Sequence, residues 1–267
     1  MSKLIALDAG HGRYTAGKRC LKSIDPNETR EWWLNDRITR YVTEGLARYD
    51  CSVMRTDDPT GATDVPLSTR CARANNAGAA ILISIHHNAG INGGSGGGIC
   101  VFAATVGSAT SKKLQKAVYE HTVNQTGLKG NRSDPLPLKN FYMVYNTNMP
   151  AILGEFGFMD STTDVPMILT DEFARRCAKG IVDATVEVLS LKPLSAPDNI
   201  DGDKGAEGIR DNGEPSEWAQ ASCDKAIAAG VFQGDGHGNY MWHEPFTREM
   251  AAVLLDRLGL INNKTEE

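Results

Sequence analysis

The sequence predicts an α/β protein, with a mostly parallel, twisted sheet that carries helices on both faces, followed by a small helical C-terminal domain. Up to residue 191, short apolar runs alternate with longer segments whose apolar residues recur at helical spacing. This alternation is typical of parallel sheets with connecting helices. From residue 192 the chain is rich in Pro, Gly, Asp and Ser, and a second set of helical patterns follows. We therefore expect domains at 1–191 and 209–267, joined by a linker at 192–208.

Each expected element rests on its pattern of apolar residues. In the segment 32–49, apolar side chains recur at helical spacing at Trp33, Ile38, Tyr41, Val42 and Leu46. Helical patterns also predict helices at 67–77, 111–126 and 171–191, and in the second domain at 217–229 and 247–258. Short apolar runs predict strands at 4–7, 51–55, 80–85, 99–103 and 151–156.

Composition and charge exclude several classes of function. The formal net charge of −5 provides no positive field to attract nucleic acid, so a nucleic-acid-binding protein is not expected. No segment approaches the roughly 20 apolar residues that a bilayer span needs. The apolar run at the N-terminus is too short for a signal peptide and has no small-residue cleavage site. We therefore expect a cytoplasmic protein until something releases it.

The six cysteines are expected to be free thiols. They are scattered without CxxC spacing, and most lie in apolar stretches. Buried thiols of a protein made in the cytosol fit this pattern better than disulfides do. No pair has the ligand spacing of a structural zinc finger.

Four polar positions stand at predicted strand or helix ends. His11 follows the first strand, Glu31 begins the first helix, a histidine pair follows the central strand, and Glu155 ends a late strand. Because ligands bind at the carboxyl ends of the strands in such sheets, the loops after residues 7, 85 and 156 should converge. Two histidines and one glutamate are the ligands of many hydrolytic zinc sites. The open fourth position holds a water that a further carboxylate can deprotonate.

Each of these residues also has a structural interpretation. His11, in a glycine-rich loop, is suited to hydrogen bonding or capping. Glu31 is suited to the first turn of a helix, where the helix dipole favours a carboxylate. Glu155 is harder to explain in this way, because a carboxylate flanked by Leu153 and Phe156 is costly unless it is paired.

The adjacent histidines His86 and His87 raise a question of direction. If the strand continues through them, their side chains point to opposite faces of the sheet. Only one of them can then face a given site, and the alternation alone does not say which.

Five motifs occur in an order that carries a family resemblance: "LDAGHG", "TRE" followed by Asn35, "RTDD" with "LSTRCARAN", "SIHHNA" and "PAILGEFGFMDS". In this order they resemble the zinc-dependent N-acetylmuramoyl-L-alanine amidases of the type 3 family, found in wall-remodelling enzymes and phage endolysins. The resemblance covers about residues 1–190. It implies a zinc-exopeptidase-like amidase fold for the first domain.

The resemblance also implies roles for individual residues. His11, Glu31 and His86 are the implied ligands of Zn²⁺, and Glu155 is the implied catalytic carboxylate. The implied substrate is peptidoglycan, cleaved at the amide bond between N-acetylmuramic acid and L-alanine.

Two nearby residues depart from the family pattern. Glu28 is a poorer match than Glu31, because Asn35 stands four residues after Glu31. His87 occupies a position that is usually small in the family. We expect its side chain to point outward or to support the site from behind.

Other residues are candidates for substrate contacts. The segment 128–151 lies where the family lines its substrate groove, which makes Tyr142, Tyr145 and Asn146 candidates. Asn88 is a further candidate, as a substrate contact or as a residue that shapes its loop. Glycines in the segment 93–98 predict a flexible or close-approach loop beside the cleft, or else a plain surface connection.

The C-terminal segment, about 60 residues long, is similar to an S-layer homology module, a unit that binds secondary cell-wall polymers. The similarity rests on the pattern "WA…AI…GVFQG…P…TREMA". Such modules usually occur as three copies. This single copy is either a solitary unit or one completed by other chains in a homo-oligomer. Arg248 is the implied contact to the anionic polymer, although Thr247 and Glu249 around it also fit an ordinary helix start.

These features together predict a peptidoglycan amidase with a wall-targeting module, of the kind that phages release to lyse their host. One alternative is a zinc carboxypeptidase that acts on wall peptides, which shares the ligand chemistry. Another is a catalytically idle wall-binding protein. The amidase frees new amino termini on L-alanine, the carboxypeptidase frees single amino acids, and the binding protein leaves purified walls intact.

Overall fold

The computed structural model describes residues 2–194 and 220–229. By its contacts the chain divides into two compact units, Met1–Pro197 and Asp198–Glu267. From the second unit the structure describes the helix α7 (Gln220–Ala228), which lies inside the predicted segment 217–229. Arg248 and the helix expected at 247–258 lie outside the described residues, so the wall-binding module stays a prediction.

The first unit contains a five-stranded sheet in the order β2-β1-β3-β5-β4. Strands β2, β1, β3 and β5 run parallel, and the edge strand β4 is antiparallel to β5. The predicted α/β class and mostly parallel sheet are therefore confirmed. The strands are β1 (Lys3–Ala9), β2 (Cys51–Arg55), β3 (Ile81–Asn88), β4 (Ile99–Phe102) and β5 (Ala151–Phe158).

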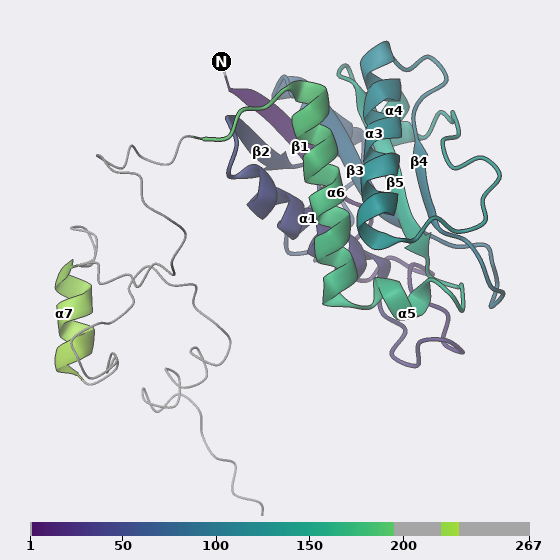
Figure 1. Ribbon diagram of the computed structural model, residues 1–267, viewed down its shortest axis with the longest axis horizontal. Coiled ribbons are helices and arrows are strands. Elements are labelled where there is room, and N and C mark those ends of the chain that lie inside the picture. The colour runs from purple at the N-terminus through teal and green to yellow at the C-terminus, as the bar shows by residue number, and fades with distance from the viewer. Residues whose placement is uncertain (1, 195–219, 230–267) are drawn as a thin grey trace, which may run out of the picture. The chain divides into compact units, whose positions relative to one another are not determined.

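Helices cover both faces of this sheet. On one face α1, α6 and α3 lie side by side (Figure 1), and α2 and α4 pack on the other face. The helices are α1 (Glu31–Leu46), α2 (Leu67–Asn76), α3 (Ala109–Thr126), α4 (Tyr142–Tyr145), α5 (Val165–Ile168) and α6 (Asp171–Leu189).

The central strand shows why the apolar runs are continuous. In β3, Ile81, Ile83 and Ile85 join the core beneath α1, α3 and α6. Leu82, which points the other way, joins the second core beneath α2 and α4. A strand buried on both faces has no polar side to interrupt its sequence.

The structure extends or adds elements that the sequence pattern did not show. Strand β3 continues through both histidines to Asn88, and β5 continues to Phe158. The pairing of these two strands shifts register between His86 and Asn88. The helices α4 and α5 have four residues each, which is too short for a helical period to be visible.

The cysteines in the described residues are free, as expected. Four of them are buried and two are partly exposed. No helix within residues 2–194 and 220–229 has the length and apolar character to span a membrane.

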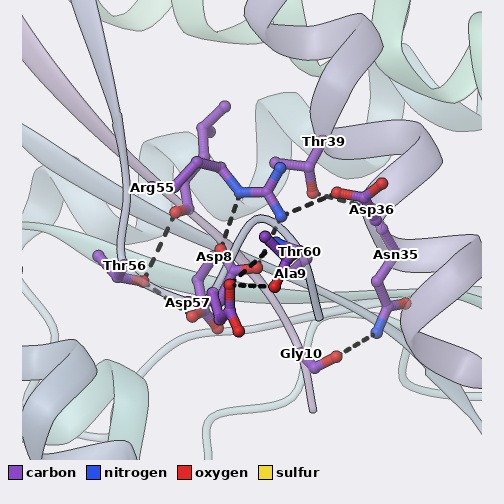
Figure 2. Close-up of polar contacts among 12 residues, drawn as sticks. Asp8, Ala9, Gly10, Asn35, Asp36, Thr39, Arg55, Thr56, Asp57 and Thr60 are labelled. Carbon is purple, nitrogen blue, oxygen red and sulfur yellow. Dashed lines mark hydrogen bonds and ion pairs between the residues drawn. The ribbon is translucent and has the colours of Figure 1, made fainter. Parts of the chain in front are cut away.

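A buried ion pair joins the first strand to α2. Arg70 is 1% exposed, and its Nη1 donates to Oδ1 of the fully buried Asp8 at 2.9 Å. The hydroxyls of Thr56 (Figure 2) and Ser84 also donate to the two oxygens of Asp8, at 2.8 and 2.7 Å. Burial raises the pKa of Asp8, but the charge of Arg70 and the bond from Ser84 outweigh it and hold the pKa below its usual value.

Replacing Arg70 with methionine should therefore destabilise the first unit by about 3 to 5 kcal/mol, because a buried carboxylate loses its partner. Urea unfolding followed by circular dichroism, with a chelator present, measures this free energy. The control is Lys179→Met, which removes an exposed pair with Asp183 and should change stability by less than about 1 kcal/mol. Equal stability losses in the two variants would contradict the structural role of the buried pair.

Candidate metal centre and active site

His11, Glu31 and His86 converge at the carboxyl edge of the sheet. One ligand atom of each lies within 4.8 Å of the others. His11 Nε2 is 3.4 Å from Glu31 Oε2, and His86 Nδ1 is 3.1 Å from Glu31 Oε1. In the described part of the chain, this is the one cluster of three His, Cys, Asp or Glu side chains suited to a metal ion.

His11 is positioned by the backbone around it. It has a left-handed φ of 67°, and its carbonyl accepts a bond from Arg70 Nη2 at 2.8 Å. A side chain at Gly10 would place its Cβ 2.0 Å from the His86 ring, so only glycine fits there. Burial, opposed by the charge of Glu31, lowers the pKa of His11 to about 4. The imidazole is therefore neutral at pH 7, with a lone pair available for a metal.

Glu31 stands in the first turn of α1 and is 1% exposed. Its Oε1 accepts bonds from Asn35 Nδ2 at 3.4 Å and from the backbone N–H of His87 at 3.2 Å, beside Nδ1 of His86. Its Oε2 has no hydrogen-bond partner and faces His11, with Lys18 Nζ at 3.8 Å. Burial raises the pKa of Glu31, but the bond and charge of His86, with His11 and Lys18, outweigh it and bring the pKa to about 2.

This arrangement fits a divalent cation. The cluster offers an ionised carboxylate whose second oxygen is buried without a hydrogen-bond partner, next to a neutral imidazole and a second imidazole. A buried carboxylate oxygen without a partner is costly unless a positive group reaches it. Two nitrogens and one oxygen are a donor set that suits zinc.

Glu155 lies beside this cluster on the neighbouring strand. It pairs in register with His86, and by strand alternation both side chains point to the same face of the sheet as Leu82 and Leu153. Its Oε2 is buried without a partner. Burial raises the pKa of Glu155 to about 7, with His86 opposing this shift and Glu31 adding to it. The site thus holds one carboxylate that is ionised at all ordinary pH values and one that is poised near neutrality.

The two adjacent histidines point to opposite faces, as the alternation predicts. His86 lines a cavity of ≈ 350 Å³ together with His11 and Arg70. His87 is 3% exposed and lies against α1, where its Nδ1 is 2.8 Å from Asn35 Oδ1. Of the two expectations for His87, the outward direction is wrong, because α1 covers this end of β3. Its place behind the ligands agrees with the other expectation. A larger cavity of ≈ 1090 Å³ lies between α1 and α6 and contains none of the candidate residues.

The remaining candidates lie outside the cluster. Asn88 ends β3, and its side chain accepts a bond from the N–H of Ala89 at 2.8 Å, which shapes the loop that follows. Tyr142 and Asn146 stand at the two ends of α4, where Asn146 accepts a bond from Asn75 at the end of α2. Hydrogen bonds in the described residues join neither of them to the metal-ligand candidates. Their contacts to substrate stay a prediction.

Glu28 and the glycine-rich loop also have definite places. Glu28 pairs with Arg19 at 2.9 Å, and not with the histidines.

The loop before β4 is held by two carboxylates: Asp160 accepts bonds from the N–H groups of Gly90 and Asn92, and Asp164 accepts one from Gly98. A Cβ at Gly98 would lie 2.4 Å from a carbonyl oxygen, which identifies a close-approach loop.

Sequence reasoning missed Lys18 and Arg70 as parts of the site. Lys18 lies in an irregular segment without a pattern, and its closeness to Glu31 depends on how that segment folds back. Arg70 lies within the quoted motif "LSTRCARAN", but its burial depends on Asp8, which is distant in sequence. The signal available in the sequence was the position of Arg70, a charged residue on the face of a short helix that packs against the core.

Comparison with known proteins identifies the family. Residues 5–187 match the family model of the N-acetylmuramoyl-L-alanine amidases (Amidase_3). The chain belongs to this amidase family. The matched range contains the three residues of the cluster, His11, Glu31 and His86, and also Glu155.

Individual relatives and one solved structure are similar to this chain over most of the matched range. The N-acetylmuramoyl-L-alanine amidase CwlM of Bacillus licheniformis is 31% identical over 194 residues, covering 72% of this chain and 71% of that protein. The endolysin of Bacillus phage SPP1 is 28% identical over 234 residues, covering 84% of this chain and 82% of that protein. The amidase structure from Clostridium difficile 630 is 27% identical with a TM-score of 0.63, covering 71% of this chain and 97% of that one.

The raised pKa of Glu155 predicts a pH-dependent change in stability for the metal-free amidase. Above pH 7 the carboxylate of Glu155 is ionised in the folded state, and its desolvation lowers the free energy of unfolding. This loss of stability disappears as the pH falls from about 7 toward 4.5, because the folded state takes up the proton before the unfolded state does. Glu155→Gln should therefore stabilise the metal-free protein by about 2 kcal/mol at pH 8, after allowance for partial exposure, and by much less at pH 5. Urea unfolding with a chelator at both pH values measures the difference. Equal effects at pH 5 and pH 8 would contradict the assigned environment.

Proposed function

We propose that this amidase-family chain hydrolyses the amide bond between N-acetylmuramic acid and L-alanine in peptidoglycan, using Zn²⁺ held by His11, Glu31 and His86. The observation that carries the proposal is the convergence of these three side chains within 4.8 Å, beside Glu155, in a chain of this family. The family match favours amide hydrolysis at the sugar–peptide junction over the carboxypeptidase alternative.

Zinc is proposed because of the donor set and its open position. Two imidazoles and one carboxylate would hold the ion and leave one position open for water, as hydrolytic zinc sites require. When bound there, zinc supplies a Lewis acid that lowers the pKa of a water to about 7 and polarises a substrate carbonyl.

Glu155 is proposed to carry the proton. It accepts the proton of the attacking water as the C–O bond forms at the lactyl carbonyl, and it delivers that proton to the L-alanine nitrogen as the C–N bond breaks. A pKa near 7 suits a group that must both accept and release a proton. Arg70 and Asn35 hold the loops and side chains that present the ligands.

The proposal extends to the biological setting. A relative of this chain is named an endolysin of a Bacillus phage, which supports a role in breaking the wall of a host cell after release from its cytoplasm. The C-terminal pattern supports attachment to a secondary cell-wall polymer through Arg248, by a solitary module or by modules from several chains of a homo-oligomer. Peptidoglycan is the substrate in either case.

Digestion of purified peptidoglycan tests the reaction. The expected products carry new amino termini on L-alanine, without new reducing sugars and without free amino acids. A chelator should abolish their formation, and added zinc should restore it, because the three ligands hold the ion reversibly. Mass analysis of the products identifies the bond. Release of single amino acids would indicate the carboxypeptidase, and intact walls would indicate a binding protein.

A second prediction separates Glu155 from the zinc ligands. Glu155→Gln should bind zinc in the same amount as the wild type but lose about 10²- to 10⁴-fold in kcat, because the proton carrier is gone. His86→Ala should lose zinc as well as activity. Zinc content by metal analysis and turnover on purified walls measure the two effects, with Glu172→Gln on the exposed face of α6 as the matched control. Near-normal turnover of Glu155→Gln would remove Glu155 from the mechanism.

A further inference from the structure

A chain of hydrogen bonds leads from His87 through Asn35 to Glu31. His87 Nδ1 lies 2.8 Å from Asn35 Oδ1. Asn35 Nδ2 lies 3.1 Å from the carbonyl oxygen of Gly10 and 3.4 Å from Glu31 Oε1, and Figure 2 shows Asn35 reaching Gly10 from α1. Asn35 is completely buried, and His87 is 3% exposed. The three side chains therefore meet away from solvent.

The chemistry of these groups fixes the direction of each bond. The carbonyl of Gly10 and the carboxylate of Glu31 can only accept, so the amide nitrogen of Asn35 faces them. The amide oxygen of Asn35 then faces His87, and Nδ1 of His87 carries the hydrogen. Because Nδ1 is occupied as a donor, it is not a free metal ligand.

The other ring nitrogen of His87 argues against a purely structural role. Its Nε2 is buried and has no hydrogen-bond partner in the structure. A buried polar atom without a partner costs about 1 to 3 kcal/mol, so an apolar side chain would serve packing better. What His87 contributes that an apolar residue cannot is the donor at Nδ1.

Asn35 and the backbone N–H of His87 bond to the oxygen of Glu31 that is turned away from His11. Oε1 receives the Asn35 amide and the backbone N–H of His87 and lies 3.1 Å from His86 Nδ1. Oε2 has no hydrogen-bond partner and faces His11. If Asn35 rotated, its oxygen would face the carboxylate and repel it. The N–H at His87 Nδ1 opposes that rotation, because with this tautomer a flipped amide would set two donors against each other.

We propose that His87 and Asn35 are a positioning pair that locks the Glu31 carboxylate with Oε2 presented to the metal, and that His87 itself does not bind the ion. This rests on the zinc site of the proposed function. Partners of this kind, which orient a ligand from behind, typically change metal affinity by about 10- to 100-fold when they are lost.

Zinc affinity in matched variants of the full chain tests the pair. His87→Leu removes the donor, whereas His87→Asn places an amide N–H close to the position of Nδ1. We expect the zinc Kd, measured by competition with a chelating dye, to rise about 10- to 100-fold in His87→Leu and to stay within about threefold of wild type in His87→Asn. Combining His87→Leu with Asn35→Ala should weaken binding no further than Asn35→Ala alone, because both act through one chain of bonds.

Several outcomes would overturn the proposal that His87 and Asn35 position Glu31. A Kd within twofold of wild type in His87→Leu, or equal losses in His87→Leu and His87→Asn, would show that the donor does not matter. Complete loss of zinc in His87→Leu, with zinc retained in His86→Ala, would make His87 a ligand. A wild-type chain that binds no zinc would overturn both the pair and the proposed function, whereas unaffected binding in His87→Leu overturns the pair alone.

A measurement on the wild-type, zinc-loaded chain covers the case in which His87→Leu does not fold. Nitrogen-15 NMR of the imidazoles should show His87 as the neutral tautomer protonated at Nδ1, with the signal assigned by its absence in His87→Asn. A neutral His87 protonated at Nε2 would overturn the proposal. Melting curves of the metal-free variants by circular dichroism show which of them are folded.

Discussion

The buried ion pair of Asp8 and Arg70 is the constraint on which the rest of the site depends. Removing two charges from water is costly, and the cost is met here by hydrogen bonds that use almost every polar atom of both groups. Arg70 uses its other N–H groups on the backbone carbonyls of Ala9, Val65 and His11. The loop after β1 is thus held by charge-assisted bonds to its backbone, which offset the strain of a left-handed His11. The histidine side chain stays free to serve as a ligand.

The site is assembled from the two sides of the sheet, which meet at its carboxyl edge. His86 and Arg70 belong to the side covered by α2, while Glu31, Asn35 and His87 belong to the side covered by α1. Arg55 ties α1 to the end of β2 by bridging Asp36 and Asp57 (Figure 2). Glu31 and Asn35 stand four residues apart, so they share one face of α1. A helix fixed at this point delivers a ligand and its hydrogen-bond partner together.

The sequence predicted those parts of the fold and the site that depend on neighbouring residues in the chain, and it did not predict those that depend on contacts between remote segments. The strands are buried on both faces and therefore read as apolar runs, and His11, His86 and Glu155 stand where those runs meet glycine or polar residues. Strand alternation correctly separated His86 from His87, but the burial of His87 depends on where α1 packs. The role of Arg70 depends on Asp8, and the glycine-rich loop depends on Asp160 and Asp164, which are remote in sequence. Such contacts produce no periodic pattern of apolar residues in the sequence. The helices α4 and α5 are too short to show such a pattern.

The two carboxylates of the site show how environment divides their roles. Burial raises the pKa of Glu31, but the hydrogen bond and charge of His86, with His11 and Lys18 nearby, outweigh it and keep the carboxylate ionised with a pKa of about 2. Glu155 has a buried oxygen without a hydrogen-bond partner, and desolvation raises its pKa to about 7. A ligand for a cation must hold its charge at every working pH, whereas a proton carrier must gain and lose a proton near neutrality. Exchanging the two residues would preserve the composition of the site and reverse both properties. The positions on α1 and β5, more than the residue type, therefore decide which glutamate binds and which transfers the proton.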